Sequence, residues 1–221
     1  MSNSDRKKAR LAAVRGGRIL GNQQDRRLHP ASVAEDRLRG YSRATPLYRA
    51  FDRTDRVVHA AATNRATAEY NPFACIMTNM KGSLNVIDAA IDKKVRSVVA
   101  LSTDKASNAV DLYGSTELAS DTLFVADNGC SGPQQTAFSV VRYGNNMGSH
   151  GSTIPFFMLI RDKGVIRITD RRMTRCMISF EEDVELVWHI FEDRVDGEVY
   201  AKRMPSMKVA DGVVAQRAPE A

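Results

Sequence analysis

The sequence predicts an α/β fold in which a mostly parallel sheet carries helices on both faces. Short apolar runs stand at residues 56–62, 98–101 and 137–141, and runs of this length are typical of buried strands. Segments whose apolar residues have helical spacing follow residues 71 and 112. Strands that alternate with helices build parallel sheets. Because 43% of the 221 residues are hydrophobic, the chain can bury a core of its own.

The first 56 residues differ from the rest in charge. They hold 14 of the 32 Lys and Arg residues but only 6 of the 26 Asp and Glu residues. Gly16, Gly17 and Gly21 lack GxGxxG spacing, so we interpret them as a loop after a weak strand candidate at residues 11–14. We expect residues 1–46 to form a solvated basic arm outside the core. Such an arm can bind a polyanion, but it lacks interleaved aromatic residues, so we do not expect nucleic acid as the partner.

The next elements are a strand and a helix. Residues 56–62 end in small side chains, including Ala60 and Ala61, which would let a ligand approach the backbone closely. Asn71 and Pro72 start a helix well, because Asn caps a helix and Pro suits its first turn. The spacing of the apolar residues predicts the buried stripe of this helix, which is Ile76, Met80, Leu84, Ile87 and Ile91.

Polar side chains follow the strand at residues 98–101. Ser102, Thr103, Asp104 and Lys105 come directly after it, and Tyr113 stands eight residues past the lysine. Tyr113 opens a segment with helical spacing of Leu112, Thr116, Ala119 and Leu123. In open α/β sheets, ligands bind at the carboxyl ends of the strands. The sequence therefore predicts a functional site at this edge of the sheet.

The strand at residues 137–141 delivers Arg142, Tyr143, Gly144 and Asn145 to the same edge. Further on, Ser179 and Glu182 form a capping box for a helix with the apolar stripe Val184, Val187, Trp188 and Phe191. Between this strand and this helix lie the arginines Arg171, Arg172 and Arg175. Guanidinium groups suit a diphosphate because they are permanently charged and fork-shaped.

Six short motifs occur in one order between residues 47 and 210: EYNP at 69–72, STDK at 102–105, VRYGN at 141–145, GSTIPFF at 151–157, ITDRRMTR at 168–175 and PSMK at 205–208. Together they resemble the extended short-chain dehydrogenase/reductases, and among these the inverting UDP-N-acetylglucosamine 4,6-dehydratases and the related CapD-like polysaccharide-biosynthesis proteins. The resemblance implies a Rossmann-like core at residues 47–150 that lacks its first βαβ unit. It also implies a substrate-binding part and tail at residues 151–221.

The chemistry implied by this resemblance is an internal redox elimination on a UDP-sugar, with NADP or NAD as cofactor. Tyr113 would take the 4-hydroxyl proton, Lys105 would remove the C5 proton, Asp104 would protonate the departing hydroxyl, and Thr103 would hydrogen-bond the sugar oxygen. The implied cofactor-binding residues are Ala60, Ala61, Ser102, Tyr143 and Asn145, and the implied substrate-binding residues are Asn145, Arg172 and Arg175. A homo-oligomer is also implied.

Glu117 departs from the family pattern, which has a lysine four residues after the tyrosine. A carboxylate one turn from Tyr113 would raise the pKa of the phenol and cannot replace the ammonium as a donor. We therefore expect weak cofactor binding and impaired activity. One alternative is a non-catalytic chain that binds a nucleotide sugar or an intact paralogue, and a second is a polyanion-binding module built on the basic arm.

Other classes of protein are not supported by the composition. Cys75, Cys130 and Cys176 are odd in number and lack CxxC spacing, so we expect neither a disulfide framework nor a metal site. No apolar run approaches the roughly 18 to 20 residues that a membrane span needs. We expect a cytoplasmic protein with no membrane partner.

Overall fold

The computed structural model describes residues 11–15, 18–23, 44–63, 65–129, 136–147, 157–158, 160, 168, 170–193 and 197–211. The chain forms two compact units. The first comprises residues 1–142 and 187–200, and the second comprises residues 143–186 and 201–221. The boundaries expected at residues 46 and 150 stay predictions.

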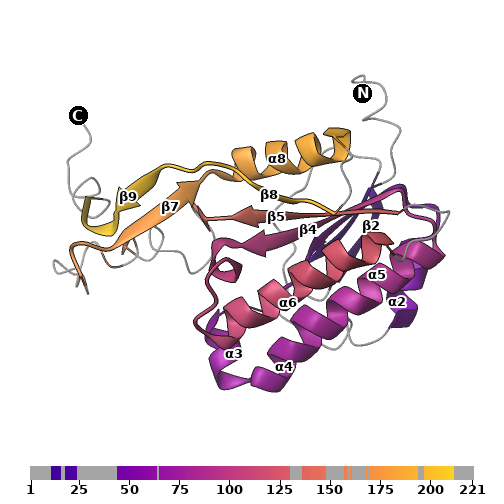
Figure 1. Ribbon diagram of the computed structural model, residues 1–221, viewed down its shortest axis with the longest axis horizontal. Helices are drawn as coiled ribbons and strands as arrows, with labels where there is room; N and C mark the ends of the chain where they lie inside the picture. The colour runs from indigo at the N-terminus through magenta and orange to yellow at the C-terminus, as the bar shows by residue number, and fades with distance from the viewer. Residues whose placement is uncertain are drawn as a thin grey trace. The chain divides into compact units, whose positions relative to one another are not determined.

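A six-stranded sheet forms the centre of the first unit (Figure 1). Its order is β2-β1-β3-β4-β5-β8. β1 pairs in parallel with β3, β3 pairs in parallel with β4, and β2 runs antiparallel to β1. The strands are β1 (Leu11–Arg15), β2 (Arg18–Gln23), β3 (Arg56–Ala60), β4 (Ser97–Thr103), β5 (Ala137–Tyr143) and β8 (Val199–Ala201). The predicted mostly parallel α/β fold is confirmed.

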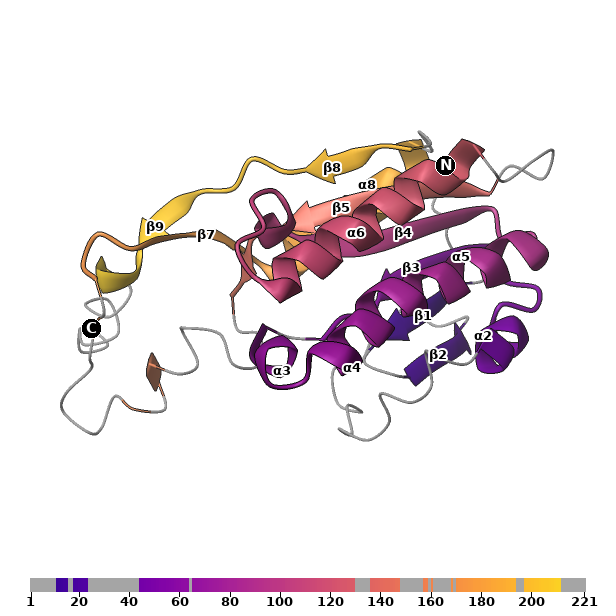
Figure 2. The same ribbon diagram turned by 60° about the horizontal axis from the view of Figure 1, so that its bottom comes forward.

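Helices cover both faces of this sheet (Figures 1 and 2). One face carries α2 (Ala44–Ala50), α5 (Gly82–Asp92) and α6 (Leu112–Ala126), with α3 (Arg65–Tyr70), α4 (Pro72–Ile76) and the π-helical turn η1 (Met77–Lys81) before α5. The second half of α8 (Phe180–Asp193) lies on the other face, where Trp188 and Phe191 pack against the guanidinium group of Arg56 at 5.9 and 5.3 Å from their ring centroids.

The core of the first unit lies between the sheet and α2, α5 and α6. Fully buried apolar side chains from each layer meet there: Leu47, Phe51, Val57, Val86, Ile87, Val98, Phe124, Phe138 and Val140. Their burial removes apolar surface from water, which is the main favourable contribution to folding. This packing fixes where β4 ends and where α6 begins.

The predicted buried stripe of the helix at residues 71–92 is confirmed at Ile87 and in part at Ile91, which packs against the core, but is wrong at Ile76. Ile87 is buried, but Ile76 is 41% exposed. The buried side instead carries Cys75, Asn79 and Ser83, which hydrogen-bond with α6 or within their own helix. Hydrophobic spacing cannot find a buried face whose side chains are small and polar, and the π-helical turn shifts the residue spacing further. The predicted cap is confirmed, since Asn71 accepts a hydrogen bond from the amide of Ala74.

The amino-terminal segment contributes to the sheet. The weak strand candidate at residues 11–14 is confirmed as β1, which lies between β2 and β3. Gly21 lies in β2, whereas Gly16 and Gly17 fall outside the described residues. Residues 11–15 and 18–23 of the segment expected to be a solvated arm therefore form two paired strands, and residues 44–46 begin α2. The other residues of this segment fall outside the described ranges.

The second unit contains a small sheet of order β6-β7-β9. β6 (Asn145–Asn146) is parallel to β7 (Thr174–Ile178), and β9 (Ser206–Lys208) is antiparallel to β7. The predicted capping box is confirmed, because the Ser179 amide donates to the Glu182 carboxylate at 3.1 Å and the Glu182 amide donates to the Ser179 hydroxyl at 3.2 Å. Among the helices of the described ranges, none is long and apolar enough to cross a membrane.

Candidate active site

The loop that follows β4 holds three of the predicted catalytic residues. Thr103 caps the short 3₁₀ helix η2 (Asp104–Ala106), and its hydroxyl donates to Asp104 Oδ1 at 3.0 Å. The ammonium group of Lys105 donates to the same carboxylate oxygen at 2.7 Å. The side chains of Lys105 and Asp104 are 39% and 40% exposed. The loop therefore presents an acid–base pair to solvent beside a buried hydroxyl.

Tyr113 reaches this loop from the first turn of α6. Asp111 caps α6 by accepting a hydrogen bond from the Gly114 amide at 2.8 Å. The phenol of Tyr113 lies close to the Thr103 side chain. Burial raises the pKa of Tyr113 well above its usual range, and Glu117 adds to this, whereas the contact with Thr103 opposes it. At neutral pH the phenol is protonated and acts as a donor.

Glu117 lies one turn further along α6 and is only 4% exposed. Burial raises the pKa of its carboxyl group to about 8, and the nearby Asp121 contributes to the shift. The group is mostly neutral at pH 7, so it is the protonated acid and not the carboxylate we expected there. In either form it supplies no positive charge beside Tyr113.

The predicted cofactor residues of the first unit lie at two strand ends. Ala60 ends β3, and Ala61, which follows it, is buried. Ser102 is buried near the end of β4, where its hydroxyl donates to Asp121 Oδ2 at 2.9 Å. Asn79 secures the segment after β3, because its side-chain oxygen accepts a hydrogen bond from the amide of Thr63 at 2.9 Å.

The remaining predicted residues lie in the second unit. The Tyr143 hydroxyl donates to the backbone carbonyl of Asp183 at 3.1 Å, and Asn145 donates to the carbonyl of Cys176 at 3.2 Å. Arg172 is exposed and pairs with Asp170 at 2.8 Å. Arg175 is exposed and donates to its neighbouring carbonyl. The structure thus brings Thr103, Asp104, Lys105 and Tyr113 together in one unit and places these four residues in the other.

Sequence reasoning missed one residue next to the site. Asp121 is buried and bonds both Ser102 and Arg142. The signal was its spacing, since Tyr113, Glu117 and Asp121 are four residues apart and therefore share one face of α6. Among the described residues no group of three or more His, Cys, Asp or Glu side chains could hold a metal ion.

Comparison with known proteins identifies close relatives of this chain. Residues 35–217 match the model of a family described as polysaccharide biosynthesis protein. The chain is 51% identical over 160 residues to an inverting UDP-N-acetylglucosamine 4,6-dehydratase of Campylobacter jejuni, an alignment that covers 71% of this chain and 48% of the relative. The chain thus spans about half the length of the curated relative it matches.

Solved structures share the fold. The X-ray structure of Pen from Bacillus thuringiensis has a TM-score of 0.75 at 34% identity, covering 79% of this chain and 54% of that one. A dTDP-glucose 4,6-dehydratase, DesIV from Streptomyces venezuelae, was solved with NAD and TYD bound. It has a TM-score of 0.71 at 19% identity, covering 79% of this chain and 60% of that one, and at this identity the likeness concerns the fold alone.

Proposed function

The chain belongs to the polysaccharide biosynthesis protein family, and from that premise we propose that it carries the acid–base site of an inverting UDP-N-acetylglucosamine 4,6-dehydratase. The observation that carries the proposal is the gathering of Thr103, Asp104, Lys105 and Tyr113 at the end of β4, where Asp104 accepts hydrogen bonds from Thr103 and Lys105 and Tyr113 lies close to Thr103. The relative with that activity is 51% identical over the aligned 160 residues. In this proposal the enzyme is a lyase of glycan biosynthesis that works in the cytoplasm.

Asp104 and Lys105 supply what the elimination half of the reaction needs. Transfer of one proton across their 2.7 Å contact converts the ion pair into a neutral amine and a carboxylic acid. The amine then takes the proton from C5 of the 4-keto sugar, and the acid gives its proton to the hydroxyl that leaves C6 as water. These two transfers regenerate the ion pair, so the loop needs no proton from solvent.

Tyr113 and Thr103 have a different part in the proposal. Because the phenol stays protonated at neutral pH, it donates a hydrogen bond to the oxygen at C4 and favours the enolate that forms as C5 loses its proton. Thr103, whose side chain lies close to that of Tyr113, helps to direct this donor. Asn145, Arg172 and Arg175 are the proposed ligands of the nucleotide sugar.

The implied nicotinamide cofactor fits the described residues poorly. β1 is followed after two residues by the antiparallel strand β2, so no helix N-terminus follows β1 to face a pyrophosphate. On α6, the neutral acid Glu117 stands where an ammonium group would hold the ribose. The proposed chemistry is therefore confined to the proton transfers above, and NADP or NAD would bind only weakly.

The same two observations favour a second candidate function. A chain that binds a UDP-sugar but cannot hold the cofactor would act as a nucleotide-sugar binding protein without turnover. Glu117 is the specific residue that favours this reading, since a buried neutral acid cannot lower the pKa of the neighbouring phenol.

Deuterium exchange at C5 separates these functions without requiring the cofactor. The chain is mixed with a UDP-linked 4-keto-6-deoxy-N-acetylhexosamine in D₂O, and incorporation at C5 is followed by NMR. Because a placed general base contributes about 10² to 10⁴ in rate, we expect exchange about a hundredfold faster than with Lys105→Ala. Lys81→Ala, an exposed lysine on η1, is the matched control and should behave like the unaltered chain.

Two other outcomes decide against the proposal. Tight binding of the UDP-sugar with no exchange above the Lys105→Ala level would establish the second candidate function. Neither binding nor exchange would exclude both functions.

A further inference from the structure

A partly buried ion pair, formed by Asp121 and Arg142, contacts the candidate catalytic loop. Asp121 on α6 is 3% exposed, and its Oδ2 accepts two hydrogen bonds at 2.9 Å, one from the Ser102 hydroxyl and one from Arg142 Nε. Arg142 comes from the end of β5, and its Nη1 donates to the Ser107 hydroxyl at 3.3 Å. One carboxylate and one guanidinium group therefore join α6, β4, β5 and the loop.

The two serines bound by this pair flank the candidate catalytic residues. Ser102 precedes Thr103, and Ser107 follows η2, so the pair contacts the loop at both of its ends. A guanidinium group can bond the carboxylate and the serine at once because its donors are held in a rigid fork.

The middle of the loop is fixed by backbone contact with α6. At Gly114 an added Cβ would lie 2.7 Å from the carbonyl oxygen of Lys105, a distance that real Cβ atoms do not adopt. Only glycine allows the first turn of α6 to approach the loop this closely. The loop of residues 102–107 is thus contacted at Ser102, at Lys105 and at Ser107.

Stability alone explains the ion pair poorly. The Asp121 carboxylate is buried, so much of the attraction within the pair is lost to the cost of removing that charge from water. Fixing one geometry is the better-attested use of such a pair.

We propose that Asp121 and Arg142 are positioning residues that hold the loop of residues 102–107, and with it the Asp104–Lys105 contact, in the geometry for proton transfer. That these two residues fix the loop follows from the fold. That they thereby affect turnover rests on the proposed function.

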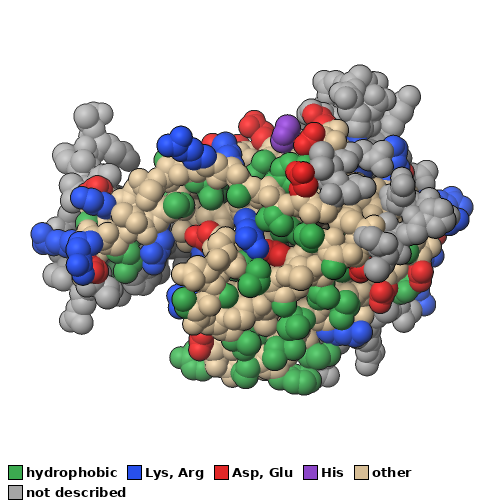
Figure 3. Space-filling view, viewed as in Figure 1, with side chains coloured by type: hydrophobic (Ala, Val, Ile, Leu, Met, Phe, Trp, Pro, Cys, Tyr) green, Lys and Arg blue, Asp and Glu red, His purple; other side chains and the backbone are tan. Residues whose placement is uncertain are grey.

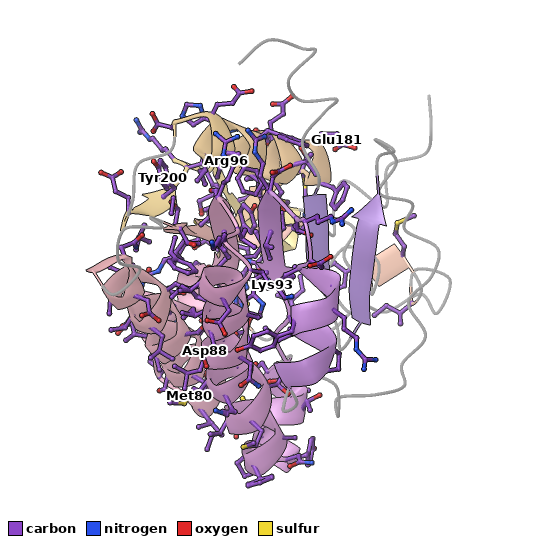
Figure 4. All side chains as sticks on the ribbon, turned by 90° about the vertical axis from the view of Figure 1, so that its right-hand side faces the viewer. Met80, Asp88, Lys93, Arg96, Glu181 and Tyr200 are labelled. Carbon is purple, nitrogen blue, oxygen red and sulfur yellow. The ribbon has the colours of Figure 1, made fainter. Side chains whose placement is uncertain are left out.

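Amide hydrogen exchange of the full chain tests the hold without any substrate. The variants are Asp121→Asn and Arg142→Gln, and the matched control is Asp88→Asn, an exposed acid on α5 (Figure 4). Loss of a charge-assisted hydrogen bond should speed exchange at residues 103–107 about tenfold, while a reference peptide from α5 keeps its rate. Equal acceleration in both peptides, or none in the loop, would overturn the proposal.

Two less disruptive variants separate a local effect on the loop from a general loss of stability. Ser107→Ala, a change at an exposed residue, removes only the contact with Arg142 and should speed exchange in the loop alone. Arg142→Lys keeps the charge but has no fork, so it should leave the exchange rate of the α5 peptide unchanged and still speed exchange in the loop. Unchanged loop exchange in both would count against the hold.

A kinetic readout tests the consequence for the reaction. If C5 exchange of the 4-keto sugar is detected in the unaltered chain, Arg142→Lys should lower its kcat about tenfold at constant KM. A rise in KM with kcat constant would contradict the positioning role. If the variants show the expected amide exchange but the unaltered chain shows no C5 exchange, the proposed function is contradicted. The inference that Asp121 and Arg142 fix the loop would still stand.

Discussion

The carboxyl group of Glu117 lies one helical turn from Tyr113 and one from Asp121, inside the first unit. Burial keeps it protonated at neutral pH, because a charge in this apolar setting would lose the hydration it has in water. The site therefore places a carboxylic acid beside the phenol of Tyr113, whereas an ammonium group in that position would lower the pKa of the phenol.

Glu117→Lys should strengthen cofactor binding. An ammonium group would offer a donor to the ribose, would face Asp121 across one turn, and would lower the pKa of Tyr113 by about 1 to 3 units. We expect the unaltered chain to bind NADP and NAD more weakly than about 0.1 mM, near the weak end of the usual range, and the lysine variant to bind at least about tenfold more tightly. Calorimetric titration measures both.

Glu117→Met is the control for this substitution, because it has similar size but no charge and should bring no gain. Low-micromolar affinity in the unaltered chain would show that Glu117 is compatible with the cofactor. No gain in the lysine variant would mean that the geometry around β1 and β2 limits binding.

Glu117 should also set the pH dependence of stability above pH 6.5. Its pKa is about 8 in the folded chain and 4.5 ordinarily, so the unfolded chain loses this proton first and stability falls as pH rises between these values. His59 acts in the opposite direction, since burial lowers its pKa from 6.5 to about 4 and stability is lost as pH falls through that range. Above pH 6.5 the effect of Glu117 is no longer offset by His59.

Urea unfolding at pH 6.5 and pH 8 measures this slope. One proton corresponds to about 1.4 kcal/mol per pH unit, so the unaltered chain should lose about 2 kcal/mol and Glu117→Gln much less. Glu185→Gln, an exposed acid on α8, should retain the slope of the unaltered chain. An equal loss in Glu117→Gln would show that another group titrates there.

At the scale of elements, the sequence predicted the strands better than the buried faces of the helices. Runs rich in apolar residues located β3, β4 and β5, because strands that are buried on both faces are mostly apolar. The helices differ, since α6 turns Thr116, Glu117, Ser120 and Asp121 inward. An inner face built from hydrogen-bonding side chains leaves no hydrophobic pattern to read, so hydrophobic spacing could not locate it.

The candidate site was predictable in part for the same reason. Residues 102–105 follow a readable strand, so their position at the sheet edge could be inferred from sequence. Asp121 could not be inferred in this way, because its importance depends on bonds to Ser102 and Arg142, two residues that only the folded sheet brings to α6.

The strand β1 supports a prediction about the amino-terminal segment. It is an inner strand, paired with β2 on one side and with β3 on the other. Ala13→Pro should destabilise the chain by about 3 kcal/mol or more, because proline cannot donate to the ladder and is excluded from inner strands. For a chain of this size that corresponds to roughly 6 to 12 °C in the thermal midpoint.

Gln23→Pro is the matched control for β1, since Gln23 ends the edge strand β2, where proline is tolerated. It should shift the midpoint by no more than a few degrees. A midpoint that is unchanged by Ala13→Pro would show that the amino-terminal segment is a solvated arm after all.

At the scale of the whole molecule, the outer face of α4 and α6 carries few of the charges that usually cover a surface, while α3 adds the exposed Arg65 and Glu69. The only Asp, Glu, Lys or Arg residues of α6 are Glu117 and Asp121, and both are buried. Large apolar side chains are exposed nearby, with Tyr70 at 91%, Phe73 at 74% and Leu118 at 40%. These helices contact one another, and hydrophobic side chains gather over this region in Figure 3.

We predict that a second copy of this chain packs on this face, because the resemblance implies a homo-oligomer and an apolar helical face can pack on itself about a two-fold axis. The double variant Tyr70→Ser/Phe73→Ser should weaken self-association at least about tenfold, since each buried aromatic side chain contributes on the order of 2 kcal/mol. Sedimentation equilibrium of the full chain measures the change. Val199→Ser, which alters an exposed apolar residue on β8, should associate like the unaltered chain. If the unaltered chain is monomeric at about 100 μM, or if both variants weaken association equally, then the face formed by α3, α4 and α6 is not the interface.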